Sequence, residues 1–309
     1  MKKNVPVLML SVLLIPFVSH AEGPIDGKVY GKINASYLST DNAGTSDSYL
    51  ESNASRLGFK GKTEVNKGMS VVYQLEYEVD PTEKAASATI FKTRNSFIGL
   101  GSTAGTFLMG FHDTPLKLAQ GKTDLFNDLA GGDIKNLVRG EVRSGDVFAY
   151  LSPDLGGLTL MAATTQYEDS QSQNDGSSFS VAYKGIENLY LSFAVDDDIA
   201  GYDTTRVVAQ YKIAALVVGA LFNSSEATGG STSEDSTVIS ASYKINNWKL
   251  KAQYGFGDEK LGKGGEQVSL GVDYKLSKES KLYVYSSSLS NDANTVDKRY
   301  TGLGIEHKF

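Results

Sequence analysis

Residue types suited to covalent or metal chemistry are scarce in this chain of 309 residues. The absence of cysteine excludes a disulfide framework, a thiolate metal site and a cysteine nucleophile. The three histidines, His20, His112 and His307, are too far apart in the sequence to indicate a metal cluster. His112 next to Asp113 is the one local hint of hydrolysis, which also requires a nucleophile within hydrogen-bond reach. We therefore expect no cofactor and no enzymatic activity, and we keep a hydrolase as an alternative.

Charged side chains at alternate positions are more informative. Pairs such as Lys60 and Lys62, or Lys92 and Arg94, lie on one face of a strand, because successive side chains of a strand point to opposite faces. The same polar faces carry Glu76, Glu78, Arg206, Lys212, Lys249 and Lys251. Burying an isolated charge is strongly unfavourable, so these faces must meet water.

The elements that position these charges are strands with one apolar and one polar face. Trp248, Leu250, Ala252, Tyr254 and Phe256 alternate with polar or small residues, and the same period recurs along the chain. The sequence predicts sixteen strands: 27–38, 54–64, 69–80, 88–100, 105–111, 139–151, 157–167, 177–184, 188–196, 203–212, 214–222, 236–245, 247–256, 265–276, 280–289 and 299–309. Short and long connections alternate between them, which is typical of a transmembrane β-barrel with short periplasmic turns.

The composition agrees with a barrel whose apolar faces meet lipid and whose polar faces enclose water. The mean hydropathy is -0.23, and the mature chain has no apolar run long enough for a membrane-spanning helix. The formal net charge of -6 argues against nucleic acid as a partner. Barrels of about sixteen strands are wide enough to hold an aqueous channel.

The first 21 residues are predicted to be a secretory signal. Lys2 and Lys3 precede an apolar stretch, and small residues occupy the positions before a cleavage site at Ala21. The mature barrel is then expected to span residues 22–309 as a single domain, because no linker interrupts the alternation.

One connection is about twice as long as the next longest. Residues 112–138 contain several leucines, which would be unfavourable in an exposed loop. We expect this segment to fold inward and narrow the lumen; the alternative is an external loop with a short helix. Residues 112–139 carry four acids and four bases, so cation or anion selectivity remains open.

The order of several short motifs resembles the Gram-negative general porins, which are trimeric sixteen-stranded channels of the outer membrane. The resemblance covers residues 22–309. Its motifs are Val29-Tyr30-Gly31-Lys32, Ser55-Arg56-Leu57-Gly58-Phe59-Lys60-Gly61, Tyr73-Gln74-Leu75-Glu76, Arg94-Asn95-Ser96-Phe97-Ile98-Gly99-Leu100, Gly110-Phe111-His112-Asp113-Thr114-Pro115-Leu116, Asp124-Leu125-Phe126-Asn127-Asp128, Tyr150-Leu151-Ser152-Pro153 and the closing strand that ends at Phe309.

The resemblance implies a pore constriction in which carboxylates of the third loop face basic side chains of the wall. The wall would hold Arg56, Arg94, Arg139 and Arg143, with Lys60 and Lys92 on the same inward faces; the loop would supply Asp113, Asp124 and Asp128. These arginines could instead pair with the loop acids and hold the loop in place. Family members often carry Arg where this chain has Phe111, which removes one basic candidate.

The resemblance further implies a homotrimer in the outer membrane, in contact with lipid and lipopolysaccharide. Its terminal Phe309 would be read by the barrel-assembly machinery, and ions and small hydrophilic solutes would pass through the lumen. A substrate-specific channel, for example for sugars or anions, and a purely structural or adhesive barrel remain alternatives.

Overall fold

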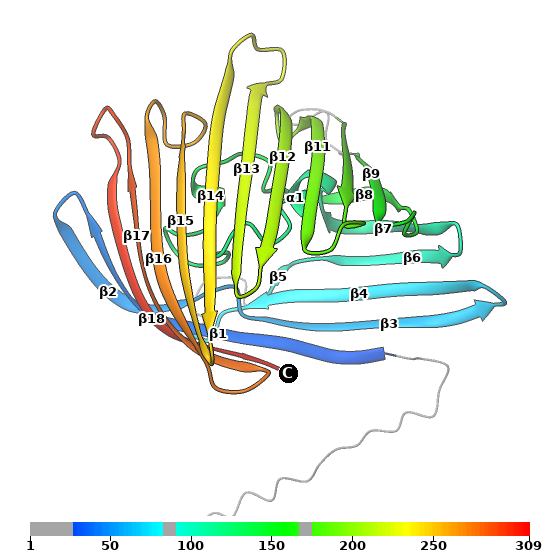
Figure 1. Cartoon of the computed structure of the whole chain (residues 1–309). Coiled ribbons are helices and arrows are strands. Elements are labelled where there is room, and N and C mark those ends of the chain that lie inside the picture. The colour runs from blue at the N-terminus through cyan, green and yellow to red at the C-terminus, as the bar shows by residue number, and fades with distance from the viewer. Residues whose placement is uncertain (1–26, 83–90, 167–174) are drawn as a thin grey trace, which may run out of the picture.

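The protein, seen in a computed structural model, forms one antiparallel sheet wound into a barrel (Figure 1). The structure describes residues 27–82, 91–166 and 175–309, so the predicted signal at residues 1–21 lies outside it. The strands are β1 (Gly27–Asn42), β2 (Thr45–Ser52), β3 (Arg56–Asn66), β4 (Met69–Val79), β5 (Phe91–Thr93), β6 (Ser96–Ser102), β7 (Gly105–Asp113), β8 (Arg143–Leu151), β9 (Leu158–Thr165), β10 (Gly176–Tyr183), β11 (Leu189–Ile199), β12 (Tyr202–Ile213), β13 (Leu216–Ala227), β14 (Ser233–Ile245), β15 (Trp248–Gly257), β16 (Gly265–Lys275), β17 (Ser280–Ser290) and β18 (Asp297–Lys308).

The barrel closes where the first strand meets the last. β1 pairs with β18 from Lys32 opposite Lys308 to Asn42 opposite Lys298, and Phe309 and Gly31 exchange backbone hydrogen bonds. β2 and β3 both pair with β1, and β5 and β6 both pair with β4. Each of these two couples is therefore one strand of the barrel with a break in it, so the eighteen labelled strands make sixteen. The prediction of an all-β, sixteen-stranded barrel is therefore confirmed.

The two faces of the sheet are inverted relative to a soluble protein, as expected. On β15, Trp248 and Phe256 are 50% and 43% exposed, whereas Lys251 and Gln253 are only 6% and 2% exposed. Lys251 lies inside the barrel, 2.8 Å from an oxygen of Asp273 on β16. Apolar side chains thus cover the outside, and polar ones face the lumen.

Some strands are longer than their apolar alternation indicates. The polar stretch at residues 39–53, expected to be a loop, is largely strand, because β1 continues to Asn42 and β2 starts at Thr45 after a tight turn. Backbone pairing needs no apolar face, so alternation marks only the part of a strand that lipid covers. No helix within the three described ranges is long and apolar enough to cross a membrane.

Candidate pore constriction

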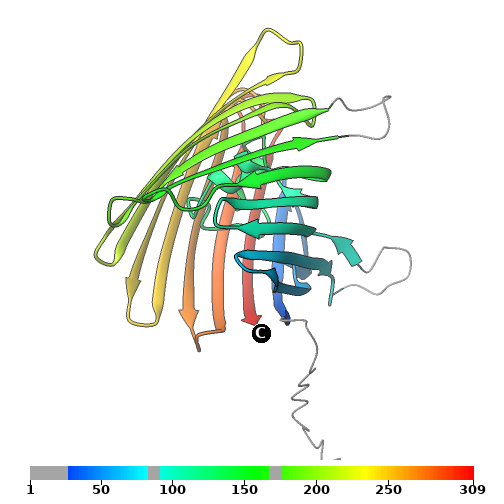
Figure 2. The same ribbon diagram turned by 90° about the vertical axis from the view of Figure 1, so that its right-hand side faces the viewer.

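The segment between β7 and β8 lies inside the barrel wall (Figures 1 and 2). It contains α1 (Pro115–Ala119) and the short 3-10 helix η1 (Ile134–Asn136). Thr114 caps α1 by accepting the Lys117 backbone N–H, and proline is favourable in the first turn. The predicted inward fold of this segment, which we call the inner segment (residues 114–142), is confirmed.

The apolar residues of the inner segment pack on the inner wall. Ile134, Leu137 and Val138 are fully buried against Val208, Leu221 and Val238 of β12, β13 and β14. Phe126 and Leu129 pack against Leu38 of β1 and against Tyr283 and Tyr285 of β17, on both sides of the closing seam. These contacts explain why leucines occur in the longest connection, and the interpretation as an external loop is wrong.

Arg206 of β12 anchors the end of the inner segment. Its side chain is fully buried, and its guanidinium donates to Glu141 Oε1 at 2.6 Å and to the Arg139 carbonyl oxygen at 2.7 Å. A third bond runs to Asn223 Oδ1 at 2.8 Å. The sequence placed Arg206 on a polar face but did not identify this role, since its partner Glu141 lies 65 positions away.

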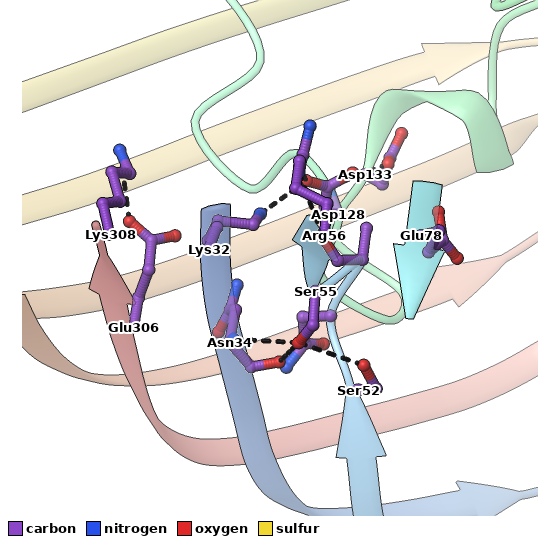
Figure 3. A network of polar contacts seen from close by, with 12 residues as sticks. Lys32, Asn34, Ser52, Ser55, Arg56, Glu78, Asp128, Asp133, Glu306 and Lys308 are labelled. Carbon is purple, nitrogen blue, oxygen red and sulfur yellow. Dashed lines mark hydrogen bonds and ion pairs between the residues drawn. The ribbon is translucent and has the colours of Figure 1, made fainter. Parts of the chain in front are cut away.

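Asp128 anchors the middle of the inner segment to the opposite wall. Its Oδ2 accepts hydrogen bonds from Lys32 Nζ at 2.9 Å and from Arg56 Nη2 at 2.6 Å (Figure 3). Lys32 belongs to β1 and Arg56 to β3, so one carboxylate ties the segment to two neighbouring strands. Arg56 and Asp128 are in direct contact, not separated by a water-filled gap.

The Asp128 anchor should survive mild acid. Burial raises the pKa of the Asp128 carboxyl, but the positive charges of Lys32 and Arg56 lower this pKa by a larger amount. The pKa of Asp128 therefore lies below its ordinary value of 3.8. A carboxyl whose pKa falls on folding stabilises the fold above its unfolded pKa, and this contribution is lost as the pH drops through the folded pKa. We expect channel conductance at constant salt to be steady from pH 7 to pH 5 and current noise to rise only below about pH 4.

The matched variant for this prediction is Asp128→Asn. It keeps the size of the side chain but removes the charge, so its current noise should already be high at pH 7. Equal noise in both proteins at neutral pH would show that Asp128 does not hold the segment.

Asp124, a predicted member of the constriction, is instead half-buried within the inner segment. Its two oxygens accept the backbone N–H groups of Phe126 at 2.9 Å and of Ile134 at 3.2 Å. Burial and the neighbouring Asp133 raise the pKa of the Asp124 carboxyl well above its ordinary range. Asp124 thus shapes the loop from within and does not line the lumen.

A polar cavity of about 710 Å³ lies between the inner segment and the barrel wall, with lining residues from β2 to β5, from β7 and β8, and from β18. Six of the predicted residues line it: Arg56, Lys92, Arg94, Arg143, Asp113 and Asp128. Phe111 also lines it, at the position where family members often carry Arg.

Two basic residues that the sequence placed here lie elsewhere. The Lys60 ammonium sits 4.6 Å from the centre of the Tyr30 ring, near the short-turn end. Arg139 precedes β8 and turns toward the long loops, where it donates to Glu234 at 2.8 Å and to the Glu259 carbonyl at 2.7 Å. Alternation along a strand predicts which face of the sheet a side chain such as Lys60 occupies, but not how far along the barrel axis it lies. Arg139 does not lie in a strand, so alternation does not apply to it.

The charges that line the cavity are balanced and mostly paired. The acids are Glu51, Glu78, Asp113, Asp128, Asp133 and Glu141, and the bases are Arg56, Lys92, Arg94, Lys117, Lys135 and Arg143. Arg94 contacts Glu76 at 2.9 Å and Glu78 at 2.7 Å.

Asp113 is also engaged on both sides. Arg143 contacts its carboxylate at 3.0 Å and Lys117 at 2.9 Å. The i, i+4 spacing of Asp113 and Lys117 was the available sequence signal for this second pair. Among the described residues, Lys92 is a cavity base without an ion pair. Paired charges of this kind fix side chains in place, and the Asp113–Lys117 pair joins the inner segment to the end of β7.

The only local hint of catalysis does not form a relay. His112 Nδ1 lies 2.7 Å from the backbone oxygen of Asp113, and its ring packs against Phe97. The Asp113 carboxylate is engaged by Arg143 and Lys117 instead. In the described ranges, no group of three or more His, Cys, Asp or Glu side chains could hold a metal ion.

Known proteins similar to this chain are porins. Outer membrane porin protein 32 of Delftia acidovorans is 25% identical, and the match covers 98% of this chain and 94% of the relative. Major outer membrane protein P.IB of Neisseria meningitidis is 25% identical over the full length of both chains. Outer membrane porin N of Escherichia coli is 26% identical and covers 82% of this chain and 68% of its own length.

Solved structures with this fold include an anion-selective porin from Comamonas acidovorans. It has a TM-score of 0.79 at 21% identity and covers 92% of this chain and 100% of its own. A Salmonella typhi OmpF complex with daunomycin has a TM-score of 0.78 at 17% identity, with 93% and 98% covered. The family described as Gram-negative porin matches residues 8–294. The chain therefore belongs to the Gram-negative porin family and is an outer-membrane β-barrel.

Proposed function

We propose that the protein is a general diffusion channel, a water-filled passage for ions and small hydrophilic solutes. The observation that carries this proposal is the cavity of about 710 Å³, which lies inside the barrel and is lined by charged side chains. A lumen of this polarity lets a hydrated solute keep hydrogen-bonding partners along its path. The porin relatives support the same activity.

The proposed eyelet is the narrow part of this passage between the inner segment and the wall. Arg56, Lys92, Arg94 and Arg143 would supply its basic side, and Asp113 and Asp128 its acidic side. Lys60, Arg139 and Asp124 are not part of it, for the reasons of position given above. The contact of Arg56 with Asp128 supports a role in anchoring the inner segment as well as in steering ions. Arg143 instead contacts Asp113, at the end of the neighbouring strand β7.

The proposed channel is not an enzyme. The position of His112 supports this, because its ring nitrogen meets a backbone oxygen and not the Asp113 carboxylate. In a hydrolase relay a carboxylate would orient this ring nitrogen, and here a backbone oxygen takes that position.

The proposed partners follow from the family. One similar structure, OmpT of Vibrio cholerae, is described in a trimer form, and we propose a homotrimer for this chain as well. Outer-membrane lipid and lipopolysaccharide would surround it. We also propose that the barrel-assembly machinery recognises Phe309, whose ring is 56% exposed while its backbone is bonded to Gly31.

Purified protein is expected to give stepwise conductance in planar bilayers and to let small neutral solutes swell liposomes. Lys92→Glu should shift the reversal potential in a salt gradient toward cation preference, because Lys92 lines the cavity and has no ion-pair partner among the residues that the structure describes. Lys67→Glu makes the same change of charge in the β3–β4 turn and should leave the reversal potential unchanged. A barrel without conductance would refute the channel and favour a structural or adhesive role.

A further inference from the structure

Lysines face one another across neighbouring strands at the short-turn end of the lumen. Lys28 lies directly opposite Lys60, Lys244 opposite Lys249, and Lys275 opposite Lys281. Like charges directly opposite in a sheet are destabilising. Three such pairs at one end of one barrel therefore need a compensating partner.

Protein carboxylates compensate only part of this charge. Asp273 contacts Lys251 at 2.8 Å and Lys281 at 3.4 Å, and Glu306 contacts Lys308 at 3.3 Å. These contacts lie on the β15–β18 side of the lumen. On the β1–β3 side, Lys32 is paired with Asp128, whereas Lys28, Lys60 and Lys62 have no ion-pair partner within the described ranges.

A separate cavity of about 420 Å³ contains the uncompensated lysines. Lys28, Lys60 and Lys62 line it together with Val72, Gln74 and Phe97 of the inner wall, and no carboxylate from residues 27–82, 91–166 or 175–309 lines it. Among the described residues, none of the three lysines forms an ion pair or a side-chain hydrogen bond. The Lys60 ammonium lies 4.6 Å from the centre of the Tyr30 ring. We call this cavity the basic pocket.

The nearest acids do not reach the basic pocket. Glu76 is bound by Tyr30 Oη at 2.9 Å and by Arg94 at 2.9 Å. Glu64, two positions beyond Lys62, lines a neighbouring cavity that Lys62 also borders, but it does not line the basic pocket and forms no ion pair within the described ranges. The basic pocket thus differs from the eyelet, where acids and bases are balanced.

We propose that the basic pocket binds multivalent oxyanions, of which phosphates are the best fit, and so makes the short-turn mouth a collecting site for anionic solutes. This inference rests on the proposed channel function and names a substrate class for it. Three ammonium groups around one cavity attract an anion in proportion to its charge, and clefts with one sign of charge raise the local concentration of the opposite ion. A lysine ammonium is a point charge on a flexible chain and does not offer the fixed, planar set of donors that arginine does. The affinity of the basic pocket for different anions should therefore follow the charge of the anion and not its shape.

Pyrophosphate is the probe that tests this proposal. Added from the short-turn side of a bilayer, it should block chloride current at lower concentration than sulfate does, with weaker block from the other side. In the double variant Lys60→Gln, Lys62→Gln, the blocking constant should rise about tenfold or more, because two of the three charges are lost. Calorimetric titration of the full-length protein in detergent measures the same binding without current.

Two further variants control the test. Lys67→Gln, Lys278→Gln makes the same change of charge in two turns outside the basic pocket, and its blocking constant should stay within about twofold of the parent. Lys60→Arg, Lys62→Arg keeps the charge and should bind as the parent does, even if the glutamine variant fails to fold. A conducting channel without pyrophosphate binding would overturn the inference alone, whereas a barrel without conductance that still binds pyrophosphate would overturn only the channel.

Discussion

Replacing residues 117–133 by a short Gly-Ser linker should raise the single-channel conductance severalfold. This change removes Phe126, Leu129 and Asp128, which fill the lumen at the level of the polar cavity. The barrel should persist, because each strand pair is closed by backbone bonds that do not involve the inner segment. Conductance in planar bilayers measures the effect, and resistance of the barrel to unfolding in detergent shows that the wall is intact.

The control for this prediction is deletion of residues 228–231 in the exposed connection between β13 and β14. It shortens a loop at the same membrane face without touching the inner segment, so the conductance should not change. An intact barrel whose conductance is unaltered by loss of residues 117–133 would show that the inner segment does not limit flow.

Arg206→Met should cause the largest loss of stability of any single substitution in the lumen. It leaves the buried Glu141 carboxylate without its guanidinium, and it frees the Arg139 carbonyl oxygen. Removing one partner of a buried ion pair costs about 3–5 kcal/mol, because the remaining charge stays desolvated. Thermal unfolding in detergent measures the loss, and frequent closures should appear in the current as the segment detaches.

The double variant Arg206→Met, Glu141→Gln separates this cause from lost packing. Neutralising Glu141 removes the orphaned charge, so much of the stability should return. Arg299→Met, at an exposed position of β18, should change the unfolding temperature very little. No recovery in the double variant would mean that the guanidinium stabilises the wall through Asn223 and not through Glu141.

The fold was predictable from the sequence because the lipid-facing alternation is local. The stripe from Trp248 to Phe256 defines both the strand and its outer face without knowledge of any partner. The strand ends were less predictable, since the upper part of β1 and all of β2 lie where polar residues occupy both faces. Hydrogen bonding alone continues the sheet there, and it leaves no pattern in the side chains.

The candidate site was predictable only in part. Arg56, Arg94, Arg143, Asp113 and Asp128 all line one cavity, as the motifs implied. The height of Lys60 depends on the register of β3 against β1, whereas the partial burial of Asp124 and the direction of Arg139 depend on how the inner segment packs. That packing joins residues far apart in the chain and has no local signal.

The basic pocket could not be predicted from the sequence for a related reason. Lys60 and Lys62 share a face by parity, but Lys28 joins them only through the register of β1 against β3. The sequence shows lysines on many strands, and only the pairing shows which of them lack an acid.

The seam between β1 and β18 has a consequence for biogenesis. Almost every other strand couple in the barrel joins near neighbours along the chain, whereas the seam joins its two ends. A chain that lacks its last strand is therefore an open sheet with two bare edges, and such edges readily pair with other chains. Completion of the carboxyl terminus and protection from aggregation are, in this architecture, the same event.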